Sequence, residues 1–139
     1  MFNKIVLGLD GSNQSMLALK FSANLSQTFN AKLIIVHAYP FTSDLRNYKE
    51  YDKLLVQRQA AGLEFFAQAR KSIGNLSIEI EDDLLEGPAA EAIISVAESR
   101  EADLIVLGTR GMGPFKGLLL GSVSTKVMQR APCPVMVVP

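Results

Sequence analysis

Short apolar runs alternate along the chain with longer amphipathic segments. Four of these runs, at residues 5–9, 32–38, 103–107 and 135–138, predict buried strands. Their apolar residues follow one another without alternation, which is typical of parallel strands covered on both faces. Residues 76–83 instead alternate apolar with acidic side chains. That alternation predicts an edge strand with one wet face.

The amphipathic segments predict four helices, at residues 13–29, 46–72, from about 88 onward, and 122–130. Ser12 is a suitable N-cap for the first helix, and Asn30 tolerates the left-handed conformation that ends one. Pro88 is expected in the first turn of the third helix. Strands and helices alternate throughout, so we expect a single α/β domain over residues 1–139. It is an open, Rossmann-like parallel sheet of five strands with helices on both faces.

Composition excludes several classes of protein. The chain has 139 residues, of which 48% are hydrophobic, and fourteen basic residues balance fourteen acidic ones. The chain therefore has no net charge that would attract nucleic acid or an anionic membrane. No apolar run is long enough to span a bilayer. The N-terminus lacks the apolar core of a signal peptide. Cys133 is the single cysteine and His37 the single histidine, which excludes an internal disulfide and a Cys/His zinc cluster. These features predict a small cytoplasmic protein that binds neither nucleic acid nor membranes.

Positive charge and glycine gather in the last third of the chain. No acidic residue follows Asp103, whereas four basic residues do, and five of the ten glycines lie between positions 108 and 121. Anion affinity is thereby concentrated in one segment.

That segment has the spacing of a phosphate-binding loop. Gly108 and Gly111 follow a strand, and nine residues later Gly121 and Ser122 open a helix. Glycine allows backbone amides to approach phosphate oxygens, and the helix N-terminus at Ser122 and Val123 favours an anion. The alternative is a flexible surface loop with helix-cap glycines. The dinucleotide, P-loop and nucleophile-elbow motifs are all absent.

The glycine spacing resembles that of ATP-binding members of the universal stress protein family, which carry G-x-x-G, nine residues, then G-[ST]. The resemblance extends to Asp10 after the first strand, to His37, and to the Pro-Val-x-Val-Val ending at residues 134–138, and so spans the chain. It implies an adenine nucleotide alpha-hydrolase-like fold with ATP as ligand, with or without Mg²⁺.

The resemblance also implies a role for each matching position. Asp10 is expected near the ribose or a phosphate-bound magnesium ion, and Gly108 at the ribose. The adenine slot is implied to be lined by Leu9, Ala38 and Leu107. The phosphates are implied to contact Arg110, Gly111, Gly121, Ser122 and Val123.

The resulting hypothesis is a cytoplasmic, regulatory ATP binder in a stress response, forming a homodimer through the strand at residues 135–138. Two alternatives remain: a slow ATP hydrolase on the same fold, and a dimerising interaction module without nucleotide turnover. Asp10 has the alternative role of capping the next helix. His37 is expected to be a hydrogen-bonded structural residue and Cys133 inert packing. We name no catalytic residue.

Overall fold

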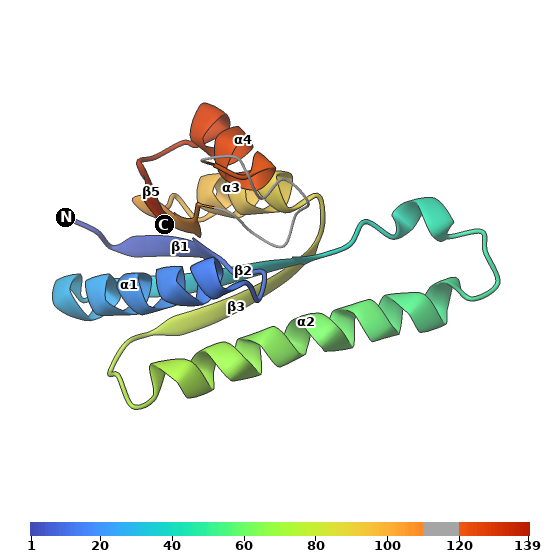
Figure 1. The fold of residues 1–139 in the computed structure, drawn as a ribbon, viewed down its shortest axis with the longest axis horizontal. Helices are drawn as coiled ribbons and strands as arrows, with labels where there is room; N and C mark the ends of the chain where they lie inside the picture. The colour runs from blue at the N-terminus through green and yellow to red at the C-terminus, as the bar shows by residue number, and fades with distance from the viewer. Residues whose placement is uncertain (110–119) are drawn as a thin grey trace.

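Five parallel strands form one sheet, in the order β3-β2-β1-β4-β5 (Figure 1). The computed structural model describes residues 1–109 and 120–139. The strands are β1 (Lys4–Gly8), β2 (Lys32–Tyr39), β3 (Ile80–Glu86), β4 (Leu104–Gly108) and β5 (Val135–Val138). The helices are α1 (Asn13–Phe29), α2 (Tyr51–Ile73), α3 (Ala89–Ser99) and α4 (Ser122–Arg130). This single-domain, Rossmann-like α/β fold confirms the predicted fold class.

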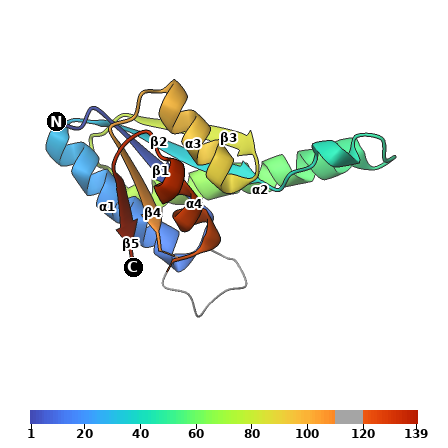
Figure 2. The same ribbon diagram turned by 90° about the horizontal axis from the view of Figure 1, so that it is seen from above.

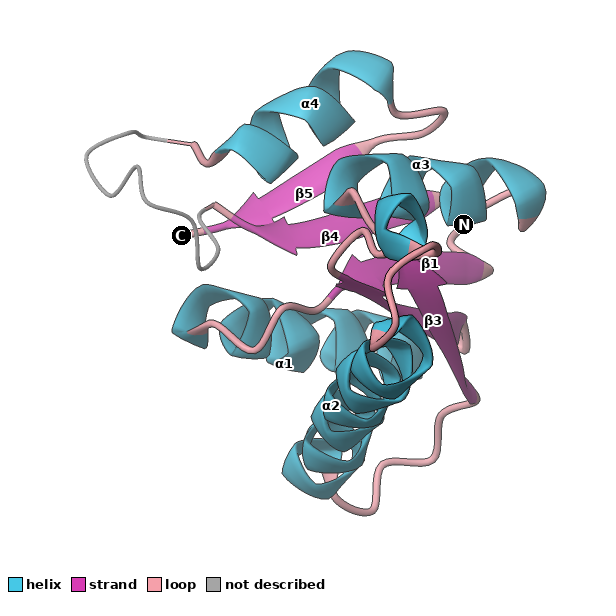
Figure 3. Ribbon diagram, turned by 90° about the vertical axis from the view of Figure 1, so that its right-hand side faces the viewer, coloured by secondary structure: helices cyan, strands magenta, loops and turns pink. Residues whose placement is uncertain are grey.

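Helices cover both faces of the sheet, α1 and α2 one face and α3 and α4 the other (Figure 3). Successive strand residues point to opposite faces. Ile5 and Leu7 accordingly join the core beneath α1 and α2, whereas Val6 packs with α3 and α4. Burial on both sides explains why the central strands have continuous apolar runs. No helix among the described residues is both long and apolar enough to cross a membrane.

The predicted helix caps at both ends of α1 are present. The Ser12 hydroxyl accepts a hydrogen bond from the Ser15 amide at 3.1 Å. Asn30 closes the helix with φ 54° and ψ 43°, the left-handed conformation. At α3, in contrast, Pro88 is the N-cap with an extended backbone and the helix begins at Ala89, so its expected place in the first turn was wrong.

The edge strand β3 lies further along the chain than the predicted 76–83. Its pairing with β2 runs from Leu33 opposite Ile80 to Tyr39 opposite Glu86. Lys32 and Arg100 both hydrogen-bond the Glu81 carboxylate, and they lower its pKa. These cations neutralise acidic residues that would otherwise disfavour pairing in mid-strand. The alternation was a correct indication of an edge strand but placed its bounds wrongly.

Helix α2 begins at Tyr51 rather than at the predicted residue 46, after a short 3-10 turn at Ser43–Leu45. Figure 2 shows this connection and the first half of α2 extending beyond the sheet. The Glu86 carboxylate fixes the start of the connection. It accepts hydrogen bonds from the amides of Thr42 and Ser43, both at 2.6 Å, and from the Ser43 hydroxyl at 2.7 Å. These bonds hold the connection against β3, and the helix therefore begins at a later residue than predicted.

We expect the Glu86 anchor to contribute to the acid sensitivity of the fold. Hydrogen bonds from Ser43 and Thr42 lower the pKa of Glu86 below the ordinary value of a glutamate side chain. A lowered carboxyl pKa stabilises the folded state above the unfolded-state pKa, and this stability is lost as pH falls through the folded-state pKa. Urea unfolding of Glu86→Gln should therefore differ most from wild type near neutral pH and converge with it in acid. The exposed Glu98→Gln serves as control. A difference from wild type that is independent of pH would contradict the assignment.

Candidate functional site

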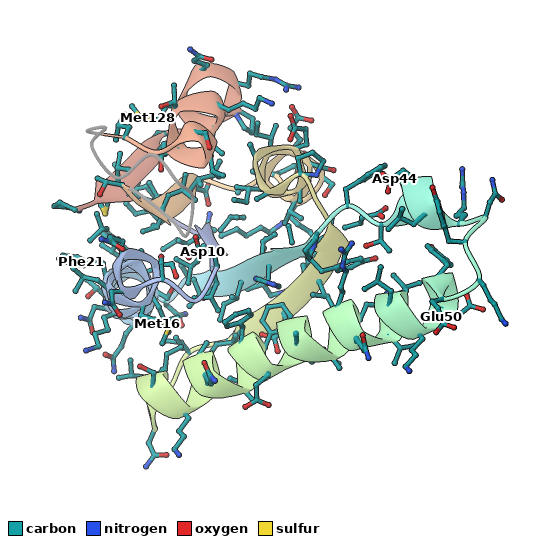
Figure 4. All side chains as sticks on the ribbon, turned by 45° about the vertical axis from the view of Figure 1, so that its right-hand side comes forward. Asp10, Met16, Phe21, Asp44, Glu50 and Met128 are labelled. Atoms are coloured by element: carbon teal, nitrogen blue, oxygen red, sulfur yellow. The ribbon has the colours of Figure 1, made fainter. Side chains whose placement is uncertain are left out.

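A pocket opens where the carboxyl ends of β1, β2 and β4 meet the first turns of α1, α3 and α4. The sheet is extended from β1 in both directions, by β2 on one side and by β4 on the other. In open parallel sheets this switch point is where ligands bind. Figure 4 shows Asp10 at this end of the sheet, between α1 and the elements of the opposite face.

Six of the ten residues predicted from the sequence line this pocket, and they come from the turn after β1, the ends of β2 and β4, and the start of α4. These six are Leu9, Asp10, Ala38, Leu107, Gly108 and Val123. Gly121 and Ser122 directly precede Val123 at the start of α4 but are not among the lining residues. Arg110 and Gly111 lie outside the described residues. The structure thus brings the predicted positions of four separate segments to one pocket, and their contacts with a nucleotide remain predictions.

The turn after β1 is held by its own side chains. Asp10 Oδ1 accepts a hydrogen bond from the Ser12 amide at 2.9 Å. The Ser15 hydroxyl donates to the Ser12 carbonyl oxygen at 3.0 Å. Ser12, not Asp10, is the N-cap of α1. The Asp10 carboxylate therefore shapes the turn and is fixed at the wall of the pocket.

Gly11 allows this turn to pass beneath α2. Its φ is +83°, a conformation that residues with a side chain rarely adopt. The Phe65 ring of α2 lies directly over the glycine, where a Cβ atom would overlap it. Helix α2 therefore supports the Asp10 turn although it contributes no residue to the pocket wall.

His37 joins the ends of β1 and β2 and is itself one of the residues that line the pocket. Its Nδ1 lies 2.7 Å from the Leu9 carbonyl oxygen. A carbonyl oxygen only accepts, so we assign the proton to Nδ1. The imidazole packs against Phe65, with ring centroids 4.7 Å apart, and against Phe66 at 6.4 Å. The side chain is thus a hydrogen-bonded structural group, as the sequence led us to expect.

Replacing His37 with leucine should destabilise the fold by about 1–3 kcal/mol, the usual cost of an unsatisfied buried polar group. Leucine fills similar space but leaves the Leu9 carbonyl oxygen without its donor. Urea-induced unfolding followed by circular dichroism measures the difference. A stability within about 0.5 kcal/mol of wild type, the range of neutral surface changes, would show that the bond contributes little.

The start of α4 is tied to the end of β4. The Ser124 hydroxyl donates to the Gly108 carbonyl oxygen at 2.7 Å, and the Gly121 amide donates to the Thr109 carbonyl oxygen at 2.6 Å. A Cβ on Gly108 would lie 2.7 Å from Gln14 Cβ and 2.9 Å from its carbonyl carbon, so the strand end fits closely against α1. The first amides of a helix have no carbonyl one turn earlier to bond. The N-terminus of α4 therefore presents a positive dipole end beside the pocket.

The contributions of α1 and α3 to the pocket were not predicted from the sequence. Ser12 and Ser15 line it from the first turn of α1, and Ala89 and Ile93 from α3. Ala89 and Ile93 are four residues apart and so share a helix face. They could have been found by noting that the helix after β3 begins at the same edge of the sheet. No group of three His, Cys, Asp or Glu residues that could hold a metal ion occurs in the described part of the chain.

The sequence model of the universal stress protein family matches residues 1–139. The chain belongs to the universal stress protein family. One relative in the family is a Thermus aquaticus protein, the "universal stress protein in QAH/OAS sulfhydrylase 3'region". It is 39% identical over 139 residues, which cover 99% of each chain.

Solved structures of the family share the fold. A universal stress protein from Lactobacillus plantarum superposes with a TM-score of 0.87 at 24% identity, covering 99% of this chain and 98% of that one. A universal stress protein solved in complex with cAMP gives a TM-score of 0.76 at 29% identity, covering 99% of this chain and 96% of that one. The sheet and helices that the described residues form are therefore the fold of these two members of the family.

Proposed function

We propose that this protein binds ATP in the pocket at the carboxyl ends of β1, β2 and β4 and acts as a regulatory nucleotide binder in a stress response. One observation carries the proposal: an apolar slot and a helix N-terminus lie in the same pocket. The glycine motif begins beside the slot at Gly108 and ends at the helix N-terminus with Gly121 and Ser122. An adenine base needs the first feature and its phosphates the second. The complex of a related universal stress protein with cAMP supports an adenine-containing ligand.

The slot has the character that an adenine ring requires. Leu9 and Leu107 are buried, with 3% and 4% of their surface exposed, and Ile93 closes the slot from α3. Ala38 is half-buried and has a small side chain. We propose that the base lies among Leu9, Ala38 and Leu107, where aliphatic side chains provide apolar contact and backbone groups of β2 provide polarity.

The phosphates would lie at the α4 end of the pocket. In this arrangement Gly108 contacts the ribose, and the phosphates contact Gly121, Ser122 and Val123 at the start of α4. Ser122 and Val123 present their backbone amides, and Gly121, whose own amide bonds to Thr109, leaves room for the phosphates. Arg110 and Gly111 complete the proposed phosphate site from the segment outside the described residues. Asp10 lines the same pocket and would contact the ribose or, through water, a phosphate-bound Mg²⁺. A protein carboxylate beside phosphates suits magnesium, which is usually held by one or two carboxylates together with substrate phosphates.

We also propose a homodimer through β5. This strand is at one edge of the sheet, and three of its four residues are half-buried rather than buried. Helices α1 and α4 both contact β5. They carry exposed apolar residues, namely Leu17 and Phe21 on α1 and Met128 on α4. Figure 4 shows Phe21 and Met128 on these two helices. An unpaired apolar edge tends to pair with another chain.

Mass spectrometry under non-denaturing conditions tests both proposals together. We expect the 15.1 kDa protomer to form a dimer or an assembly of dimers, and added ATP should give one nucleotide per protomer while added CTP gives none. Equal retention of ATP, CTP and inorganic triphosphate would mean that the site recognises an anion and not adenine. No retention of any of them at saturating concentration would overturn the nucleotide proposal. A monomeric mass would overturn the dimer proposal alone.

A further inference from the structure

Helix α2 carries a line of apolar residues on a face that the fold does not use. Val56, Ala60, Leu63 and Ala67 follow one another at intervals of four, three and four residues, which places them on one side of a helix. All four are exposed, Val56 to 64% and Leu63 to 58%. We call these four residues the α2 stripe. The buried residues of α2 are Gly62, Phe66 and Ala69, which lie on another side.

No described element covers the α2 stripe. Helix α2 packs on β2, β3 and α1 with its buried side. Figures 1 and 3 show the helix on the outside of the molecule, away from α3 and α4. We propose that the α2 stripe is an interface between two copies of this chain, in which two α2 helices pack antiparallel about a twofold axis between Ala60 and Leu63.

The sizes of the side chains fit this arrangement. With the axis at that point, Val56 lies opposite Ala67 of the partner subunit, and Leu63 lies opposite Ala60 of the partner subunit. Each large residue therefore meets a small one, and the two alanines of each helix, seven residues apart, allow the helices to approach closely. The 4-3-4 spacing is that of a coiled-coil seam.

The charges beside the stripe favour the same orientation. Glu50, Gln57, Glu64 and Lys71 are exposed and recur every seven residues along one border of the stripe. In the antiparallel arrangement Glu50 lies near Lys71 of the partner subunit, and Gln57 lies near Glu64 of the partner subunit. A parallel arrangement would instead place this border on opposite sides of the two-helix seam, so that Glu50 would not meet Lys71 of the partner subunit. This complementarity within one chain is the reason to assign the stripe to a second copy.

The α2 interface and the proposed β5 interface are at different edges of the sheet. Helix α2 covers β2 and β3, whereas β5 is the opposite edge strand. Both contacts can therefore form at once and would build an assembly larger than a dimer. The α2 proposal rests on no property of the nucleotide pocket.

Equilibrium sedimentation of full-length protein tests the interface. Leu63→Glu places a charge in the stripe at an exposed position, so we expect a folded protein whose assembly mass is half that of wild type. Gln68→Glu adds the same charge at an exposed position of α2 outside the stripe and should keep the wild-type mass. A Leu63→Glu protein with the wild-type mass would overturn the proposal and leave the β5 dimer intact.

Disulfide formation tests the orientation and detects weak association. In a Cys133→Ser background, the double variant Val56→Cys with Ala67→Cys should form a covalent dimer under mild oxidation, and Val56→Cys alone should not. Absence of the covalent dimer in the double variant would overturn the proposal. The α2 stripe would then be a contact surface for a different protein. Efficient cross-linking of Val56→Cys alone would show a parallel pair and overturn the antiparallel arrangement. Charge reversal gives a further check, because Glu50→Lys should weaken association and added Lys71→Glu should restore it.

Discussion

Gly11→Ala should be among the most destabilising single changes in this protein, at about 2–6 kcal/mol. A residue with a side chain at φ +83° costs roughly 1–3 kcal/mol. Overlap of the new Cβ with the Phe65 ring, whose Cζ would lie 2.9 Å away, adds the usual roughly 1–3 kcal/mol of overpacking. Urea unfolding measures the loss.

Gly74→Ala provides the matched control. Gly74 has φ +72°, but nothing lies within 4 Å of the position that its Cβ would occupy. Only the backbone cost of roughly 1–3 kcal/mol should appear there. In a Phe65→Ala background, the cost of Gly11→Ala should fall to that of Gly74→Ala. An unchanged cost in that background would show that α2 does not support the Asp10 turn.

Gly121→Val should abolish nucleotide binding while leaving the fold intact. Gly121 has φ −73° and ψ 169°, which valine adopts without strain, so the substitution acts through the bulk that it places at the proposed phosphate site. Gly111→Val should have the same effect by the same steric block. Arg110→Ala should weaken binding only about tenfold, or roughly 1.4 kcal/mol, because we expect backbone amides and not this side chain to hold the phosphates.

Calorimetric titration with ATP compares the three variants, and circular dichroism confirms that each is folded. Gly121→Ala should give an intermediate loss, because its side chain is smaller than that of valine. Equal losses in all three variants would mean that side-chain charge carries the site. Wild-type affinity in Gly121→Val would place the phosphates elsewhere.

The sequence predicted those parts of the fold that local pattern determines. The bounds of α1, α4 and β5 agree with the structure because caps and apolar runs act within a few residues of the element they limit. The starts of α2 and β3 were wrong because contacts between distant residues set them. Glu86 fixes the connection before α2 from more than forty positions away, and Lys32 and Arg100 neutralise β3 from other elements.

The candidate site likewise contains residues that the local sequence pattern predicts and residues that only the packing of distant segments determines. Residues that follow strands could be predicted, because parallel strands bring their carboxyl ends to one edge of the sheet. Leu9, Asp10, Ala38 and Gly108 accordingly surround one pocket. The contributions of Ala89 and Ile93, and the support that Phe65 gives to the Asp10 turn, depend on how helices cross that edge. Spacing along the chain does not contain this information.

The most direct test of the nucleotide proposal is the affinity of the wild-type protein and of Ala38→Phe for ATP, measured by isothermal titration calorimetry. We predict one ATP per protomer with micromolar affinity, about 8 kcal/mol of binding free energy, for wild type. The phenylalanine ring should fill the slot between Leu9 and Leu107 and remove detectable binding. Folded wild-type protein that binds no ATP at millimolar concentration, or Ala38→Phe that binds it as tightly as wild type, would contradict the assignment of this pocket.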